Sequence, residues 1–330
     1  MFRTSTISSP VTLEAAGLVA LADLSAATVR TALTGSASFL DALVLVPGMH
    51  KQQCADEVNH GEFPMAGAMT SGYVFRIENP AAVSYLQSIG KAGHLVTAQV
   101  SQHPSRNSDL SLKNQVFQSL FTTGVPATLL YLLCPISTVT VFVFLATIGD
   151  WWGCTVIGMF VLARLINVII IWRRNKPGWK GAKEDGDGDL LILLTQDRWV
   201  RLRGTINDLK TVTAGQWLRD VSAVESVAVM LSTVLVYAAV ILAFNASTVG
   251  SLLLACLLLC SVTFLTLSNS FTQCLQMYDC IVQKEGEPKK YYRRLDMAKE
   301  MVEMSNRDDW AIGMGLVHPK SGPHRVVTVV

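Results

Sequence analysis

Charged residues are scarce in this sequence, and two long stretches almost lack them. The chain of 330 residues contains 16% charged and 50% apolar residues, whereas soluble domains carry about 25% charged residues. Residues 116–172 contain two charges, Asp150 and Arg164, and residues 221–278 contain one, Glu225. The other charges lie in three separate blocks. This layout indicates a membrane protein with aqueous segments and argues against a soluble protein with one large core.

Sequence features that identify a chemistry are also missing. There is no Gly-x-Ser-x-Gly elbow, no Walker A loop and no dinucleotide-binding fingerprint. No histidine lies in any long apolar stretch, and His50, Cys54 and His60 are spaced irregularly for zinc. Residues 185–189 resemble the start of a calcium loop but lack the later Gly and Glu of an EF-hand. We therefore expect no metal and no cofactor, and a net charge of +2 gives no indication of nucleic acid.

Four stretches have the roughly 20 mostly apolar residues that a transmembrane helix needs. The links between the first and second and between the third and fourth are short, GDWW and NASTVG, which predicts two tight helical hairpins. The start of the chain, MFRTSTISSPVTLEAAG, has no continuous apolar core, so we expect no cleaved signal peptide. The predicted spans are residues 127–148, 153–172, 222–244 and 250–268.

The distribution of Lys and Arg predicts the orientation of these spans. Segment 173–220 contains ten of them, the chain from Lys284 onward contains nine, and the two short links contain none. Because cytosolic loops are enriched in Lys and Arg, both basic segments are expected in the cytosol, and an even number of spans puts both termini there. Trp151 and Trp152 are expected at the outer interface of an endomembrane or plasma membrane, and Trp172 at the inner one.

The remaining segments predict a split cytosolic α+β domain. Residues 1–115 form its N-terminal α+β region, with strands at 71–77 and 94–100. The loop 173–221 contains DLLILLTQDRWVRLRGTI, which predicts a β-hairpin. A lone hairpin is marginal in water, so we expect it to pair with the N-terminal strands. Residues 269–330 are expected to continue the last span as a cytosolic helical extension, followed by a tail.

Three polar residues within the predicted spans are candidate site residues. An arginine near the middle of a bilayer costs about 2.5–3.5 kcal/mol, so Arg164 needs compensation. Asn167 shares its helix face, and Glu225 is the acidic residue of another span. A direct Arg164–Glu225 pair is disfavoured by a depth difference of about 6 Å. The alternatives are that Arg164 caps carbonyls freed by Pro135 or that it binds a substrate.

Two cysteines follow the last span closely. Cys274 and Cys280 are predicted just inside the membrane, where cysteines are candidates for palmitoylation.

The chain contains the motifs GDWW, ARLINVIIIWRR and DLLILLTQDRWVRLRG, followed by a second pair of spans. In this combination, over roughly residues 125–280, it resembles an uncharacterised group of multi-pass membrane proteins from filamentous fungi. The resemblance implies a membrane location and transfers neither an activity nor a site.

These observations favour a membrane-anchored structural or regulatory subunit, since the expected cytosolic part is large and catalytic motifs are absent. The alternative is an oligomeric transporter or channel for small solutes or ions that uses Arg164, Asn167 and Glu225, and a membrane enzyme is the third choice. The expected partners are the lipid bilayer and other copies or subunits of a membrane complex.

Overall fold

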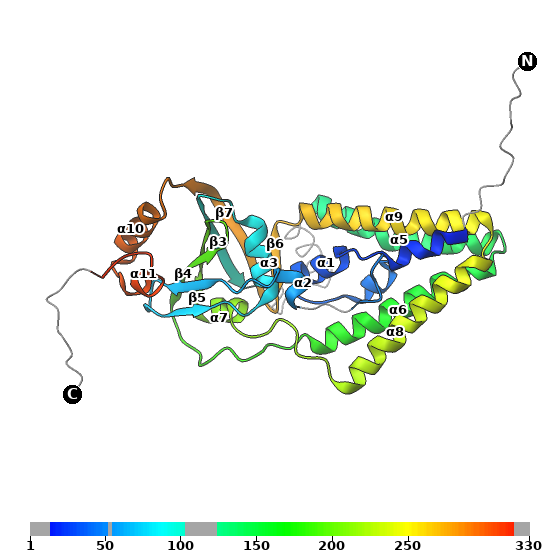
Figure 1. Cartoon of the computed structure of the whole chain (residues 1–330), viewed down its shortest axis with the longest axis horizontal. Coiled ribbons are helices and arrows are strands. Elements are labelled where there is room, and N and C mark those ends of the chain that lie inside the picture. The colour runs from blue at the N-terminus through cyan, green and yellow to red at the C-terminus, as the bar shows by residue number, and fades with distance from the viewer. Residues whose placement is uncertain (1–13, 52–54, 103–123, 320–330) are drawn as a thin grey trace, which may run out of the picture.

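The computed structural model describes residues 14–51, 55–102 and 124–319. Four long helices form one end of the elongated molecule and a seven-stranded sheet forms the other (Figure 1). We call these parts the helical unit and the sheet unit.

The four predicted spans are confirmed as four helices long and apolar enough to cross a membrane. Trp151 and Trp152 lie at the start of α6 and Trp172 near its end, and all three are at least 49% exposed. The four helices of the helical unit are α5 (Val125–Thr147), α6 (Trp151–Arg174), α8 (Ala223–Leu242) and α9 (Thr248–Phe271).

The helices pack in pairs that differ from the predicted hairpins. Helix α5 packs along α9, and α6 packs along α8, while α5 and α6 touch less extensively. One buried hydroxyl bridges each pair: Ser268 donates to the Ala127 carbonyl at 2.7 Å, and Ser232 donates to the Ala163 carbonyl at 3.0 Å. The two pairs meet at the turn end of the helical unit and diverge toward the sheet unit (Figure 1).

Asp150 joins the two turns at that end. Its Oδ1 accepts the Gly153 N–H at 2.9 Å and so caps α6, and its Oδ2 accepts the N–H and the hydroxyl of Ser247 at 2.9 and 2.6 Å. Ser247 is itself the N-cap of α9. A Cβ at position 250 would overlap the Asp150 carboxylate, so Gly250 permits this close approach.

Residues 14–50 fill the space between the helix pairs, and we call them the N-terminal insert. This is a correction, because residues 1–115 were expected to form one cytosolic α+β region. Ala20, Leu45 and Met49 are fully buried in the core of the helical unit. The insert contains η1 (Glu14–Leu21), α1 (Ala26–Thr34) and η2 (Phe39–Leu43).

The first part of the insert runs along the whole helical unit. Gly17 lies against Val240 and Ala243 at the turn end, where any larger residue would collide with the Ala243 side chain. Gly35 has a φ of +69° and lies against Gln276 in the sheet unit, where a Cβ would overlap the backbone. The segment 17–35 therefore connects the two ends of the helical unit. The sequence of this segment is not one continuous apolar stretch, so it did not predict a transmembrane helix.

Of the two predicted N-terminal strands, the one found at 94–102 pairs with the middle hairpin, whereas the one found at 74–76 pairs with residues 65–68, a strand that was not predicted. The sheet order is β2-β1-β4-β5-β3-β7-β6, and all neighbours are antiparallel except β3 and β5. The middle hairpin, β4 and β5, is therefore held by N-terminal strands on both sides. The strands are β1 (Met65–Ala68), β2 (Val74–Arg76), β3 (His94–Gln102), β4 (Asp187–Leu194), β5 (Arg198–Thr205), β6 (Cys274–Met277) and β7 (Cys280–Lys290).

Helices cover both faces of the sheet. Val200 and Leu202 face the layer of α3 and α7, whereas Leu191 and Trp199 face the layer of α10 and α11. Burial on both faces explains why the β4 sequence is continuously apolar rather than alternating. The remaining helices are α2 (Ala55–Asn59), α3 (Pro80–Ile89), α7 (Ile206–Thr213), η4 (Ala243–Asn245), α10 (Arg294–Ser305) and α11 (Asp309–Gly313).

The expected helical extension after the last span is wrong. Helix α9 ends at Phe271, and the next residues form the hairpin β6–β7, in which Tyr278 takes a φ of +51° at the turn. The apolar residues at 274–282 fit a helical spacing, but β7 completes the edge of β3 with main-chain hydrogen bonds over most of its length. A tertiary pairing of this kind overrides local helical preference.

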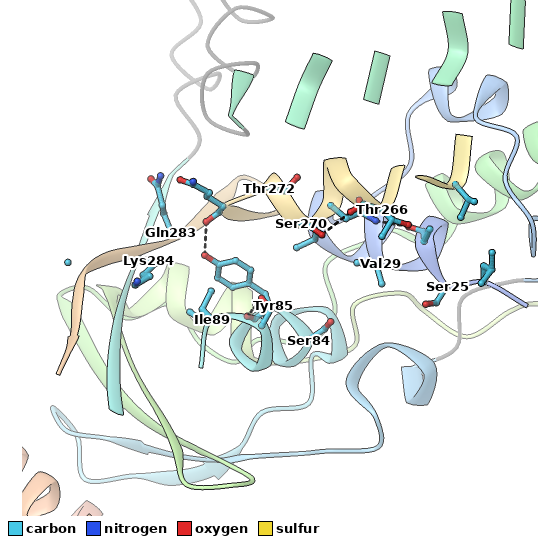
Figure 2. A pocket seen from close by; sticks show the side chains of 18 residues that line it. Ser25, Val29, Ser84, Tyr85, Ile89, Thr266, Ser270, Thr272, Gln283 and Lys284 are labelled. Atoms are coloured by element: carbon cyan, nitrogen blue, oxygen red, sulfur yellow. Dashed lines mark hydrogen bonds between the residues drawn. The ribbon is translucent and has the colours of Figure 1, made fainter. Parts of the chain in front are cut away.

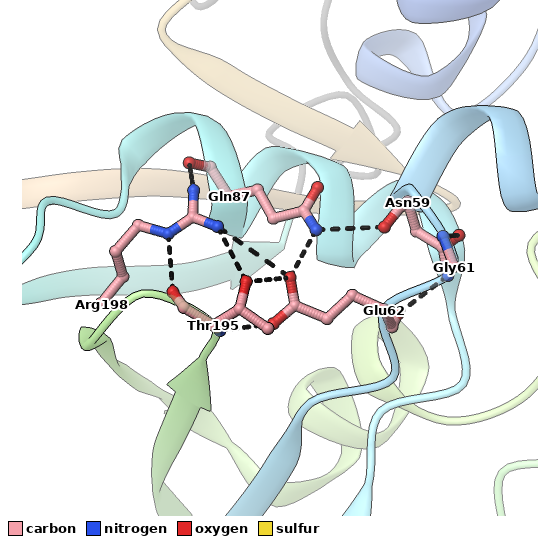
Figure 3. A network of polar contacts seen from close by, with 6 residues as sticks. All are labelled: Asn59, Gly61, Glu62, Gln87, Thr195 and Arg198. Carbon is pink, nitrogen blue, oxygen red and sulfur yellow. Dashed lines mark hydrogen bonds and ion pairs between the residues drawn. The ribbon is translucent and has the colours of Figure 1, made fainter.

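A polar network fastens the hairpin turn of β4–β5 to the helix layer (Figure 3). The Glu62 carboxylate accepts the Thr195 N–H and the Gln87 side-chain amide, both at 2.6 Å. Arg198 donates to the Gln87 carbonyl at 3.0 Å. Since its groups bond to one another, we interpret this network as structural.

The Asp150 contact predicts that Asp150→Ala destabilises the protein. Three donors would lose a charged acceptor, and we expect a loss of about 1–3 kcal/mol in the free energy of unfolding. Denaturation in detergent measures it, with Asp185→Ala as the control because that carboxylate is exposed in a loop. Equal stability of the two variants would contradict the role given to Asp150.

Candidate functional site

The polar side chains inside the helical unit converge on the backbone of the N-terminal insert. Thr138 donates to the Leu43 carbonyl, Asn167 to Met49, Thr233 to His50 and Asn269 to Ala26, at 2.7 to 3.0 Å. The four donors come from all four long helices. Leu43, Met49 and His50 lie at the end of η2 or in the irregular segment after it, where backbone carbonyls need donors from other elements, whereas Ala26 is the first residue of α1.

Asp41 is the centre of this arrangement. It lies in η2 and forms a capping box, in which the Ser38 N–H donates to its Oδ2 at 2.7 Å. Tyr131 of α5 donates its hydroxyl to Asp41 Oδ1 at 2.7 Å. The guanidinium of Arg30 lies 4.7 Å from the centre of the Tyr131 ring. Asp41 also interacts electrostatically with both Arg30 and Arg164.

Arg164 is explained by this cluster. It lies ten residues before the end of α6, about 15 Å along the helix, and is 3% exposed. Its Nε donates to the Asp41 carbonyl at 3.3 Å. Arg164 thus caps a backbone carbonyl, as one of the alternatives proposed, but the carbonyl belongs to the insert and not to the helix that contains Pro135.

Glu225 lies elsewhere and pairs with a different arginine. It forms two hydrogen bonds with Arg219, at 2.5 and 2.9 Å, and a capping box with Ser222 at the start of α8. This end of α8 is next to the sheet unit. The structure therefore brings Arg164 and Asn167 together around the insert and separates Glu225 from them, which rules out the direct Arg164–Glu225 pair in this conformation.

Sequence reasoning missed Arg30, Asp41 and Tyr131. The available signal was a single acidic residue in the apolar stretch SFLDALVLV, which is too short to span a membrane. An acid in such a stretch requires a partner when the stretch is buried. The partners of Asp41, Tyr131 and Arg164, lie 90 or more positions away in the sequence. The local sequence pattern does not show that they meet Asp41.

The two candidate palmitoylation sites lie in the interior of the sheet unit. Cys274 is 0% and Cys280 4% exposed, in β6 and β7. Burial raises the pKa of the Cys274 thiol to about 11 and that of Cys280 to about 12. Because the thiolate is the reacting species, the structure does not favour acylation at either position.

Within the described residues no cluster of His, Cys, Asp and Glu could hold a metal ion. Cys54, which belonged to the irregular His50 pattern, lies outside the described residues.

Comparisons with protein-family models, with curated proteins and with solved structures give no match for this chain.

The Asp41 cluster predicts which acidic residue is coupled to Arg164. Arg164→Leu removes a cation from a buried carbonyl and a nearby carboxylate, and we expect a loss of about 1–3 kcal/mol in the free energy of unfolding. Combined with Asp41→Asn, it should show a coupling of at least about 0.5 kcal/mol. Combined with Glu225→Gln, it should be additive, because Glu225 pairs with Arg219. Denaturation in detergent of the three single variants and the two double variants tests this. Coupling of Arg164 to Glu225 but not to Asp41 would contradict the role given to Asp41.

The thiol environment predicts slow alkylation of Cys274 and Cys280 in the folded protein. A pKa raised from 9.0 to about 11 lowers the thiolate fraction of Cys274 at pH 8 about 100-fold. Alkylation by N-ethylmaleimide, followed peptide by peptide with mass spectrometry, should be at least that much slower than in the unfolded chain. Similar rates in the folded and unfolded protein would show that these thiols are accessible.

Proposed function

We propose that this protein is a multi-pass integral membrane protein in which the helical unit anchors and positions the sheet unit at the cytosolic surface. In this proposal it acts as a structural or regulatory subunit of a membrane assembly. Its four long apolar helices support the membrane location.

One observation favours an anchor over a transporter. Arg164, Asn167, Thr138 and Thr233 would be the natural lining of a polar path through the helical unit, but they bond to the backbone of the N-terminal insert instead. Glu225 is engaged by Arg219 at the end of its helix. The insert thus occupies the space that a transported solute would need.

The orientation rests on the position of the basic segments. Residues 173–220 and 284–319 both belong to the sheet unit or border it, so their excess of Lys and Arg supports a cytosolic sheet unit. An even number of spans would leave both termini in the cytosol. The extra passage of 17–35 makes the number of crossings odd. We therefore propose that the chain enters the helical unit at Glu14 from the non-cytosolic side.

The ion pair of Asp23 and Lys51 favours a second candidate, in which several copies assemble or a hydrated cleft opens beside this ion pair. Its charged atoms are 2.6 Å apart and its side chains are 73% and 43% exposed. Lys51 follows His50, whose carbonyl binds Thr233 in the middle of α8. Exposed charges at this depth are unfavourable against acyl chains. We propose that water or a second protein surface covers this face.

Cysteine accessibility tests both the orientation and the choice between anchor and transporter. Single cysteines replace Lys183, Ser247, Asn167 and Ser232, and sealed vesicles receive a charged, membrane-impermeant thiosulfonate on either side. We expect cytosolic labelling at position 183, opposite-side labelling at 247, and no labelling at 167 or 232, because both are 0% exposed.

Labelling at 167 and 232 would instead indicate a water-filled path and favour the transporter. Labelling of 183 and 247 from the same side would refute the proposed topology. An N-terminal tag cleaved by a protease added on the side of Ser247 would support the entry of Glu14 from that side.

A further inference from the structure

The end of the sheet unit that lies away from the helical unit carries a basic and aromatic surface. It contains the end of β7, the start of α10 and the link between them, KKYYRRL at 289–295. Figure 1 shows β7 leading to α10 at the far end of the molecule from the long helices. Lys91 lies beside this segment, because the Tyr291 N–H donates to the Gly93 carbonyl at 3.0 Å and the His94 N–H to the Lys91 carbonyl at 3.1 Å. We call residues 289–295 and Lys91 the distal surface.

The distal surface has more cations than its acidic neighbours neutralise. Lys289 pairs with Glu300, and Arg294 pairs with Asp197. Asp296 lies in the first turn of α10, at the helix end that favours a negative charge. The other cations of this surface are exposed and have no ion pair among the described residues: Lys91, Lys290 and Arg293.

An aromatic side chain protrudes next to these cations. Tyr292 is 91% exposed, and the Nζ of Lys290 lies 5.5 Å from the centre of its ring. Leu295, three residues on, is 42% exposed. A side chain this exposed lies on a convex surface, whereas sites for small molecules are concave. Tyr beside Lys and Arg is the combination that lies at membrane interfaces, where one part of each side chain is apolar and the other polar.

The distal surface lies too far from the helical unit to act on the lipids around it. Strand β7 begins beside the end of α6, where the Tyr278 hydroxyl donates to the Lys176 carbonyl at 3.4 Å. From Cys280 to Lys290 the strand rises about 33 Å. Attraction between exposed charges is largely screened beyond about 8 Å at physiological ionic strength. The unpaired cations therefore need a partner other than the membrane that holds the helical unit.

Hydrogen bonds between the two units fix the direction in which the distal surface faces. Tyr85 of α3 donates its hydroxyl to the Gln273 carbonyl, just after α9, at 3.0 Å (Figure 2). The indole N–H of Trp217, in the core of the sheet unit, donates to the Gly35 carbonyl of the insert at 2.8 Å. All copies in one membrane then present this surface in the same direction, and weak contacts of several copies act together.

We propose that the distal surface binds the anionic surface of a second membrane, opposite to the one that holds the helical unit. Lys91, Lys290 and Arg293 contact the lipid phosphates and carboxylates, and Tyr292 lies among the headgroups. A flat membrane accepts a convex surface directly, whereas an acidic protein needs a pocket for the Tyr292 ring. The membrane location and the cytosolic position of the sheet unit come from the function proposed above, on which this inference rests.

The experiment measures whether the protein joins two vesicles. Full-length protein is reconstituted into phosphatidylcholine vesicles that contain a biotinylated lipid and are held on streptavidin beads. Fluorescent vesicles without protein are added, made of phosphatidylcholine alone or of equal parts phosphatidylcholine and phosphatidylserine. We expect capture of the anionic vesicles and not of the neutral ones. Salt at 1 M should release them, because it shortens the screening length to about 3 Å.

Variants of exposed residues locate the contact. Lys290→Glu combined with Arg293→Glu should lower the apparent affinity for anionic vesicles at least about tenfold, because two cations near the anionic surface are reversed. The matched control, Lys176→Glu combined with Lys183→Glu, makes the same charge change at exposed lysines between α6 and β4 and should keep the capture. Tyr292→Ser should lower the affinity less, because the charges remain.

Insertion is checked separately, by resistance of the protein to extraction with alkaline carbonate. Protein that is extracted contradicts the proposed function, whereas inserted protein that captures no anionic vesicles overturns the present inference alone. Equal capture of neutral vesicles, or an equal loss of capture in the control pair, also overturns it. Binding of soluble polyglutamate without capture of anionic vesicles would overturn it too, and would identify the partner as an acidic protein.

Discussion

The helical unit depends on one constraint, the need to satisfy the backbone carbonyls of the N-terminal insert that lie between its helices. Residues 26–50 pass between the helix pairs partly without helix or sheet, so their carbonyls need donors from elsewhere. Thr138, Asn167, Thr233 and Arg164 supply these donors. Polar residues that would otherwise destabilise these apolar helices therefore stabilise the insert. The insert in turn fills the space between the diverging helix pairs, so the interior is closely packed.

The same constraint explains the charge in the middle of α6. A buried arginine is stable only when its charge is balanced and its donors are used. Asp41 provides the carboxylate and the carbonyl, and it is in turn held by Tyr131 and its own capping box. The insert and the helices are thus mutually dependent: the insert supplies the acid, and the helices supply the cation and the hydroxyl.

The sheet unit is linked to the helical unit because its strands come from segments that the long helices separate in the sequence. Its strands come from before the first long helix, from between the second and third, and from after the fourth. Strand β3 lies beside both β5 and β7, so it holds the middle and last segments in one sheet. Because these segments are joined through the helices, the sheet fixes the positions of the ends of α6, α8 and α9.

The sequence by itself determined the four long helices and the hairpin β4–β5, because apolar length and strand patterning are local properties. It also indicated that the hairpin needs further strands, but of its two neighbours it predicted β3 and not β1. Only the tertiary structure decided the pairing of α5 with α9, the path of the insert and the strand β7. Each of these rests on contacts between distant segments, such as Tyr131 with Asp41, or on an open strand edge. Local pattern does not encode such contacts: residues 274–282 fit a helix equally well, and the edge of β3 made them a hairpin.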